Sequence, residues 1–155
     1  MSKDFSQGVV EHGDGSGQPT DYLFRISLKA LIRDEQGRVL VVKETGRDWW
    51  GLPGGGMNHG ETITSALARE LHEEVNVIGR FTWRIITADD PGPLRRIDAW
   101  QLCLIIEVVP ETFEFSAGED GDEVAFLDPE TLKNSSKKVE RRVYECSQLA
   151  SFHLM

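Results

Sequence analysis

The sequence predicts an α/β fold in which helices pack on a mixed β-sheet within a single domain. β-prone segments, one strongly helical segment, further β-prone segments and a final helical region follow one another along the chain. This order is typical of a sheet with helices packed on it. The chain has 155 residues, 39% of them hydrophobic, with neither repeats nor an interdomain linker, so we expect one buried core.

The domain begins with two β-prone segments that are expected to form an antiparallel pair. Tyr22–Asp34 partly alternates between apolar and polar residues, and Val39–Glu44 is the expected returning strand. Between them, the sequence EQGR at 35–38 has the polar, glycine-containing character of a hairpin turn. Residues 45–56 follow as a loop or short extended segment, because Pro53 and the run Gly54–Gly56 interrupt them.

The remaining elements are predicted from periodicity and from turn residues. They are a helix over Glu61–Val75, strands over Val77–Ala88, Ala99–Val109 and Glu123–Leu127, an exposed loop over 89–98, and one or two helices from Asp128 onward. Residues 1–20 are rich in Gly, Ser, Asp and Gln and are expected to form a flexible N-terminal arm. The domain is therefore assigned to residues 21–155.

Composition excludes several classes of partner. A net charge of −9 argues against binding to nucleic-acid polymers, which normally requires a basic face. No apolar run approaches the roughly 18–20 residues of a membrane span, and no secretory signal is recognisable. Cys103 and Cys146 are expected to be free thiols in a reducing compartment, which favours a cytoplasmic location.

The predicted helix presents an apolar face and, beside it, an acidic face. At about 100° per residue, the acidic face consists of Glu70, Glu73 and Glu74. Such crowding destabilises a helix by a few tenths of a kcal/mol per pair. One interpretation is a solvated face with an ion pair between Arg69 and Glu73; the other is a site for a hard cation such as Mg²⁺. The preceding glycine turn favours the cation, because it lets a backbone carbonyl approach without side-chain interference.

The same stretch resembles the Nudix box, the signature of the Nudix hydrolases. That signature runs G, five residues, E, seven residues, then R-E-U-x-E-E-x-G-U, where U is aliphatic. The corresponding positions are Gly55, Glu61, Arg69, Glu70, Leu71, Glu73, Glu74, Asn76 and Val77. Only the last glycine differs, and Asn76 is expected to adopt the same left-handed conformation at the end of the helix.

The resemblance implies an α/β/α sandwich around a mixed sheet and a divalent-metal-dependent pyrophosphohydrolase. Family members hydrolyse nucleoside diphosphates linked to another moiety, so a small nucleotide is the expected substrate, either a (deoxy)nucleoside triphosphate or a nucleotide sugar such as ADP-ribose. Mg²⁺ or Mn²⁺ is the expected cofactor, and a homodimer is a further expectation. The alternative is a non-catalytic sensor or regulator that binds a nucleotide without cleaving it.

The resemblance also assigns roles to individual residues. Glu73 and Glu74 would be the principal metal ligands, and the carbonyl of Gly54 would be an additional one. Glu70 would be a further ligand or the group that orients or deprotonates the attacking water. Arg69 would hold the glutamates by ion pairing.

Residues at the edges of the signature are assigned with less guidance from the motif. Glu61 would hold the junction between the loop and the helix. Some family members take their catalytic base from a loop outside the box, and the acidic segment SAGEDGDEV makes Glu119 and Glu123 the preferred candidates here. Arg84, Arg95 and Arg96 are candidates for contacts to phosphate or ribose, although exposed arginines usually make neither.

Overall fold

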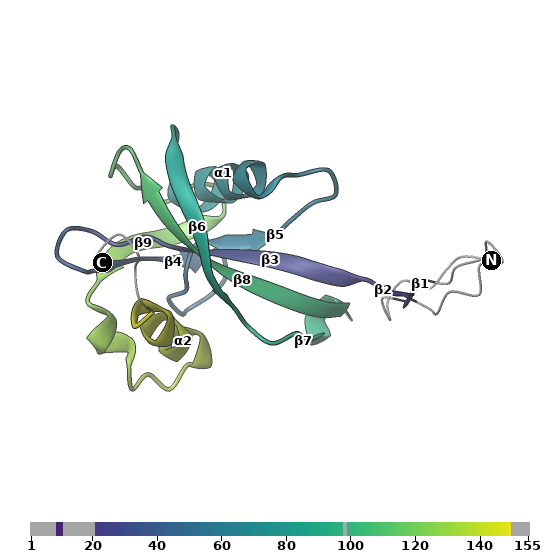
Figure 1. The fold of residues 1–155 in the computed structure, drawn as a ribbon. Helices are drawn as coiled ribbons and strands as arrows, with labels where there is room; N and C mark the ends of the chain where they lie inside the picture. The colour runs from purple at the N-terminus through teal and green to yellow at the C-terminus, as the bar shows by residue number, and fades with distance from the viewer. Residues whose placement is uncertain (1–8, 11–20, 98, 150–155) are drawn as a thin grey trace.

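The central element of the fold is a five-stranded mixed sheet (Figure 1). The computed structural model describes residues 9–10, 21–97 and 99–149. The sheet consists of β3 (Phe24–Leu31), β5 (Gly54–Gly56), β6 (Phe81–Ala88), β7 (Gly92–Leu94) and β8 (Ala99–Pro110). Four strands follow the order β5-β3-β8-β6, and β7 pairs with β8. The β3–β8 pair is parallel and the others are antiparallel, which makes the sheet mixed.

A second, two-stranded sheet joins β4 (Val39–Glu44) to β9 (Gly121–Leu127) in antiparallel register. The predicted hairpin after β3 is therefore only partly correct. The turn is present, and the Leu40 amide donates to the Ile32 carbonyl at 2.9 Å. Pairing then stops at an isolated bridge between Arg33 and Val39, because β4 diverges to meet β9.

Several predicted boundaries also change. The segment expected as an exposed loop contains β7 and a short 3₁₀ helix, η2 (Arg95–Ile97). The C-terminal region forms η3 (Pro129–Leu132) and the helix α2 (Lys138–Ser147), as predicted. Within the expected N-terminal arm, Val9–Val10 forms β1, which pairs with β2 (Asp21–Tyr22). The rest of that arm lies outside the described residues.

Two helices cover opposite faces of the sheets (Figure 1). Alternation along β3 directs Leu28 and Ala30 into the core beneath α1 (Ile63–Val75), whereas Leu31 lies in the core beneath α2. The architecture is therefore the α/β/α sandwich that the sequence predicted. No helix within the described ranges combines the length and apolarity needed to cross a membrane.

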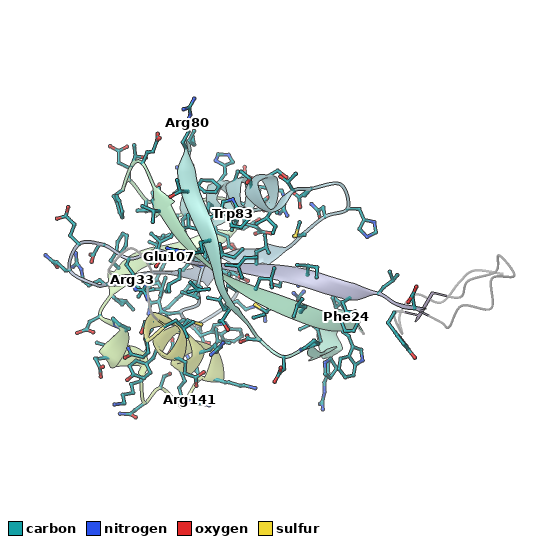
Figure 2. All side chains as sticks on the ribbon, in the orientation of Figure 1. Phe24, Arg33, Arg80, Trp83, Glu107 and Arg141 are labelled. Atoms are coloured by element: carbon teal, nitrogen blue, oxygen red, sulfur yellow. The ribbon has the colours of Figure 1, made fainter. Side chains whose placement is uncertain are left out.

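A buried ionic contact ties the sheet to α2 (Figure 2). Arg33, two residues beyond the end of β3, donates to the Glu107 carboxylate at 3.0 Å. The same guanidinium donates to the carbonyls of Ser147 and Leu149, at 3.1 and 2.9 Å, at the C-terminal end of α2. Glu107 is 5% exposed, so this contact provides a partner for a carboxylate inside the protein.

Candidate active site

The acidic helix α1 has well-defined ends. Thr62 is its N-cap, and its hydroxyl accepts from the Ser65 amide while the Ser65 hydroxyl accepts from the Thr62 amide. This reciprocal pair satisfies two amides that the first turn leaves without partners. At the other end, Asn76 has a φ of 57°, which confirms the predicted left-handed cap. The direction of the helix, and hence of its carboxylates, is fixed from both ends.

The glycine strand β5 brings the backbone unusually close to its neighbours. A Cβ at Gly54 would lie 1.9 Å from the Leu28 carbonyl oxygen, and its φ of +139° is one that L side chains rarely adopt. A Cβ at Gly55 would lie 2.6 Å from a carboxylate oxygen of Glu70. Because the residues of β5 are glycines, the Glu70 carboxylate can lie directly against this strand.

Two of the three clustered carboxylates are buried. Glu70 is 8% exposed and Glu74 is 4% exposed. Glu74 accepts a hydrogen bond from the Gly54 amide at 2.8 Å. Burial raises the pKa of Glu74 to about 8, and it also raises the pKa of Glu70. A carboxylate that is held away from water without full compensation of its charge is suited to binding a cation.

Arg69 connects the loop before α1 to the acidic face. Its guanidinium donates twice to Glu61, at 2.7 and 2.8 Å, and once to the Gly56 carbonyl at 2.9 Å. It also lies 2.8 Å from Glu70 and 3.4 Å from Glu73. Hydrogen bonds from Arg69 lower the pKa of Glu61 to about 2. Glu74 receives no contact from Arg69, so this arginine neutralises only part of the cluster.

The acidic loop before β9 docks onto the end of α1 through its backbone. The amides of Ser116, Gly118 and Asp120 donate to the last carbonyls of the helix, those of Val75, Glu74 and Glu73, at 3.1, 3.1 and 2.9 Å. A Cβ at Gly118 would lie 2.3 Å from the Glu73 carbonyl oxygen, so glycine is required there. This docking directs one particular acidic side chain, that of Asp120, into the adjoining cavity.

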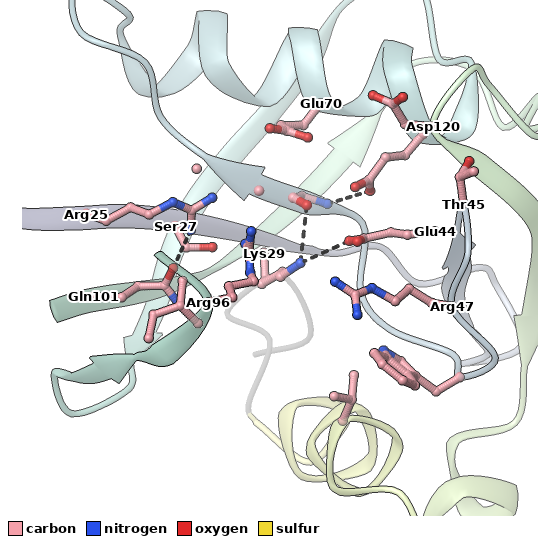
Figure 3. A pocket seen from close by; sticks show the side chains of 17 residues that line it. Arg25, Ser27, Lys29, Glu44, Thr45, Arg47, Glu70, Arg96, Gln101 and Asp120 are labelled. Carbon is pink, nitrogen blue, oxygen red and sulfur yellow. Dashed lines mark hydrogen bonds and ion pairs between the residues drawn. The ribbon is translucent and has the colours of Figure 1, made fainter. Parts of the chain in front are cut away.

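The cavity beside the acidic face has a volume of about 620 Å³ (Figure 3). Its lining includes the basic residues Arg25, Lys29, Arg47 and Arg96 and the acidic residues Glu44, Glu70, Glu74 and Asp120. Of the two acidic residues that the sequence favoured as a base, Glu119 is exposed and Glu123 pairs with Lys43 at 3.8 Å; the lining includes neither. The roles of Glu119 and Glu123 stay predictions, and Asp120 is the member of this loop that reaches the cavity.

The donors on this wall suit a hard divalent cation in their chemistry. They are carboxylates and a backbone carbonyl, which Mg²⁺ and Mn²⁺ prefer. In the described part of the chain, no three acidic, histidine or cysteine side chains form a preformed coordination group. The Gly54 carbonyl accepts from the Lys29 ammonium at 3.2 Å, and Arg69 holds Glu70. A bound cation would therefore compete with these two basic side chains.

Taken together, the sandwich and the motif-bearing helix at its edge define a Nudix-type domain. The model of the NUDIX domain family matches residues 23–146, and the chain belongs to this family. A solved structure of a MutT protein from Methanosarcina mazei Go1 superimposes with a TM-score of 0.65 at 21% identity, covering 80% of this chain and 92% of that chain. This likeness extends the family assignment to the observed fold.

The chain also resembles curated proteins named RNA pyrophosphohydrolase. It is 37% identical to one from Psychrobacter sp. (strain PRwf-1) over 67 residues, which are 43% of this chain and 39% of that protein. It is 35% identical to one from Mannheimia succiniciproducens over 88 residues, which are 52% of this chain and 44% of that protein. The chain thus spans less than half the length of these two relatives.

Proposed function

We propose that the chain is a Mg²⁺- or Mn²⁺-dependent pyrophosphohydrolase that cleaves a nucleoside diphosphate linked to another moiety. The observation that carries this proposal is the burial of Glu70 and Glu74 beside a strand of three glycines, at the wall of a cavity that also holds four basic side chains. Membership of the NUDIX family supports it. A solvated acidic helix face would not need two buried carboxylates.

The reaction is hydrolysis of a phosphoric anhydride. The oxygen of a water molecule bonds to one phosphorus while the bridging P–O bond breaks, which gives a nucleoside monophosphate and a phosphorylated second product. The divalent cation, when bound, neutralises charge on the phosphate oxygens and acts as a Lewis acid. The protein residues bind that cation, position the phosphates and accept the proton of the water.

The roles proposed for the acidic residues are those that the family resemblance assigns to them. Glu74 and Glu73 would hold the cation, with the Gly54 carbonyl as an additional oxygen donor. Glu70 would be a further ligand or would orient the water, since it lies against β5 at the cavity wall. Arg69 would keep these carboxylates in place through its contacts to Glu70 and Glu73.

The proton acceptor has two structural candidates at the cavity. Glu70 is buried on α1, where burial raises its pKa toward the range that suits a general base. Asp120 approaches from the docked loop on the other side of the cluster. Glu119 and Glu123 remain the candidates predicted from sequence. Replacing each of the four carboxylates in turn by the corresponding amide would identify the proton acceptor.

The test is hydrolysis by the full chain with Mg²⁺ on a panel of nucleoside triphosphates, nucleotide sugars and a short RNA bearing a 5′-triphosphate. Release of nucleoside monophosphate and of phosphate products is measured for the wild type, for Glu73→Gln and for Glu35→Gln. Glu35 is exposed in the hairpin turn and serves as the matched control. We expect Glu73→Gln to lose at least about 100-fold in kcat, because one oxygen donor for the cation is lost, and Glu35→Gln to behave like the wild type.

Turnover that survives Glu73→Gln unchanged would remove the ligand assignment. Tight nucleotide binding without any turnover across the panel would instead support a non-catalytic sensor. The RNA belongs in the panel because the relatives named above are RNA pyrophosphohydrolases. A net charge of −9 favours small nucleotides over a polymer, and that preference is measured directly by this comparison.

A further inference from the structure

Two arginines, Arg25 and Arg96, line the cavity along with the carboxylates of α1 (Figure 3). Arg25 extends from β3 over the glycine strand, and a Cβ at Gly56 would lie 2.4 Å from its guanidinium nitrogen. The Arg25 guanidinium donates to the side-chain carbonyl of Gln101 on the neighbouring strand β8. Arg25 is thus held at a defined position by a missing side chain and a hydrogen bond.

Neither arginine has a carboxylate partner among the described residues. The ion pairs among the described residues include that of Lys29 with Glu44 at 3.7 Å, and none of these pairs involves Arg25 or Arg96. Burial and the positive charge of Arg96 lower the pKa of Arg25, and the negative charge of Glu70 offsets only part of this. Two like charges that face one cavity repel each other, and a bound anion would relieve this repulsion.

The position of these arginines relative to the carboxylates allows one ligand to reach both. The Glu70 carboxylate lies against Gly55, and the Arg25 guanidinium lies against the next residue, Gly56, on the opposite side of the edge strand β5; both side chains line the same cavity around this edge. From the spacing of consecutive Cα atoms and the contacts to the two Cβ positions, the two groups lie within roughly 12 Å of each other. A short phosphate chain that begins at the acidic wall can therefore extend to Arg25.

We propose that Arg25 and Arg96 form an anion site for a third phosphate, so that the substrate carries a chain of three or more phosphates. This inference rests on the function proposed above and narrows its substrate class. A diphosphate joined to a sugar places an uncharged group beyond its second phosphate, and two unpaired guanidinium groups would gain little there. A terminal phosphate gains charge-assisted hydrogen bonds from both. Gln101 acts as a positioning residue, because it orients Arg25.

The kinetic test compares GTP and ATP with ADP-ribose as substrates of Arg25→Gln, Arg96→Gln and Arg95→Gln. Arg95 is the matched control, since it is the exposed neighbour of Arg96 and does not belong to the cavity lining. We expect the first two variants to raise KM for the triphosphates about 10- to 100-fold each, as loss of a hydrogen bond to a charged group does. For the same two variants the KM for ADP-ribose should rise several-fold less than the KM for the triphosphates, and Arg95→Gln should change either KM less than about twofold.

The second readout is direct binding of inorganic tripolyphosphate and of pyrophosphate in the presence of Mg²⁺. The wild type should bind tripolyphosphate at least about tenfold more tightly than pyrophosphate. Arg96→Gln should lose this preference, and Arg95→Gln should retain it. If no nucleotide is hydrolysed but this preference is found, the anion site stands and the enzymatic proposal fails. Equal loss on triphosphates and ADP-ribose, or equal binding of the two inorganic anions by the wild type, would overturn the anion site.

Discussion

Raising the pH of the metal-free protein should weaken its fold through Glu74. The pKa of this carboxyl is about 8 in the folded chain because of burial, against an ordinary value of 4.5. Its folded pKa is raised, so the stability gained from protonated Glu74 is fully present below about pH 4.5 and is lost as the pH rises through about 8. The loss therefore falls within an easily accessible pH range.

The expected size follows from proton linkage. At pH 6 the folded chain keeps Glu74 protonated, whereas in the unfolded chain the carboxyl is almost fully ionised. Between pH 6 and pH 8 the folded chain holds a proton that the unfolded chain has released, so each rise in pH favours unfolding. This gives a loss of roughly 2 kcal/mol in the free energy of unfolding, and the loss levels off as the folded form itself ionises near pH 8. Glu74→Gln cannot ionise and should lack this contribution.

The assay is urea unfolding followed by tryptophan fluorescence, in EDTA, at pH 6, 7 and 8. Wild type and Glu74→Gln are compared, so that changes from other titrating groups cancel. Added Mg²⁺ should stabilise the wild type more at pH 8 than at pH 6, because a cation and a proton compete for Glu74. Parallel pH profiles for wild type and Glu74→Gln would refute the reasoning.

Two further substitutions test the supporting structure, both by urea unfolding. Arg33→Ala should cost about 1.5–3 kcal/mol because the buried Glu107 carboxylate loses its 3.0 Å contact to Arg33 and keeps the longer one to Arg84 at 3.6 Å, whereas Arg38→Ala at an exposed ion pair should cost less than about 1 kcal/mol; equal losses would contradict this. Gly118→Ala should cost about 1–3 kcal/mol, since its Cβ would meet the Glu73 carbonyl at 2.3 Å. Gly92→Ala is the control, because a Cβ there has no neighbour within 4 Å, and matching losses would remove the docking argument.

Local pattern was sufficient for α1 and insufficient for the strand partners. The helix ends at Val75 as predicted, and Asn76 caps it. In β4, every residue from Val39 to Val42 is buried, so no alternation marks which face or which partner it takes. Its partner β9 lies about 80 residues further along the chain. Which distant strand pairs with β4 depends on the packing of the whole fold and cannot be read from the residues of β4 alone.

In the site, too, residues of one local motif were predictable from the sequence, whereas residues brought in by distant segments were not. The three glutamates follow from one helical motif, but Asp120 could not be distinguished from Glu119 and Glu123 by sequence, because backbone docking of the loop selects among them. Arg25 and Lys29 did leave a signal, since alternate residues of a strand share one face. The cytoplasmic location and the homodimer stay predictions.

Net charge alone is a poor guide to what this cavity accepts. The chain carries −9, yet four basic side chains line the cavity together with four acidic ones. Charge near a binding site acts through its arrangement, because fields are screened over about 8–10 Å in physiological salt. If the acidic wall holds a divalent cation, its negative charge is largely neutralised, and Arg25 and Arg96 then make the cavity positive overall. An acidic protein can in this way bind an oligophosphate locally while its remaining surface repels long polyanions.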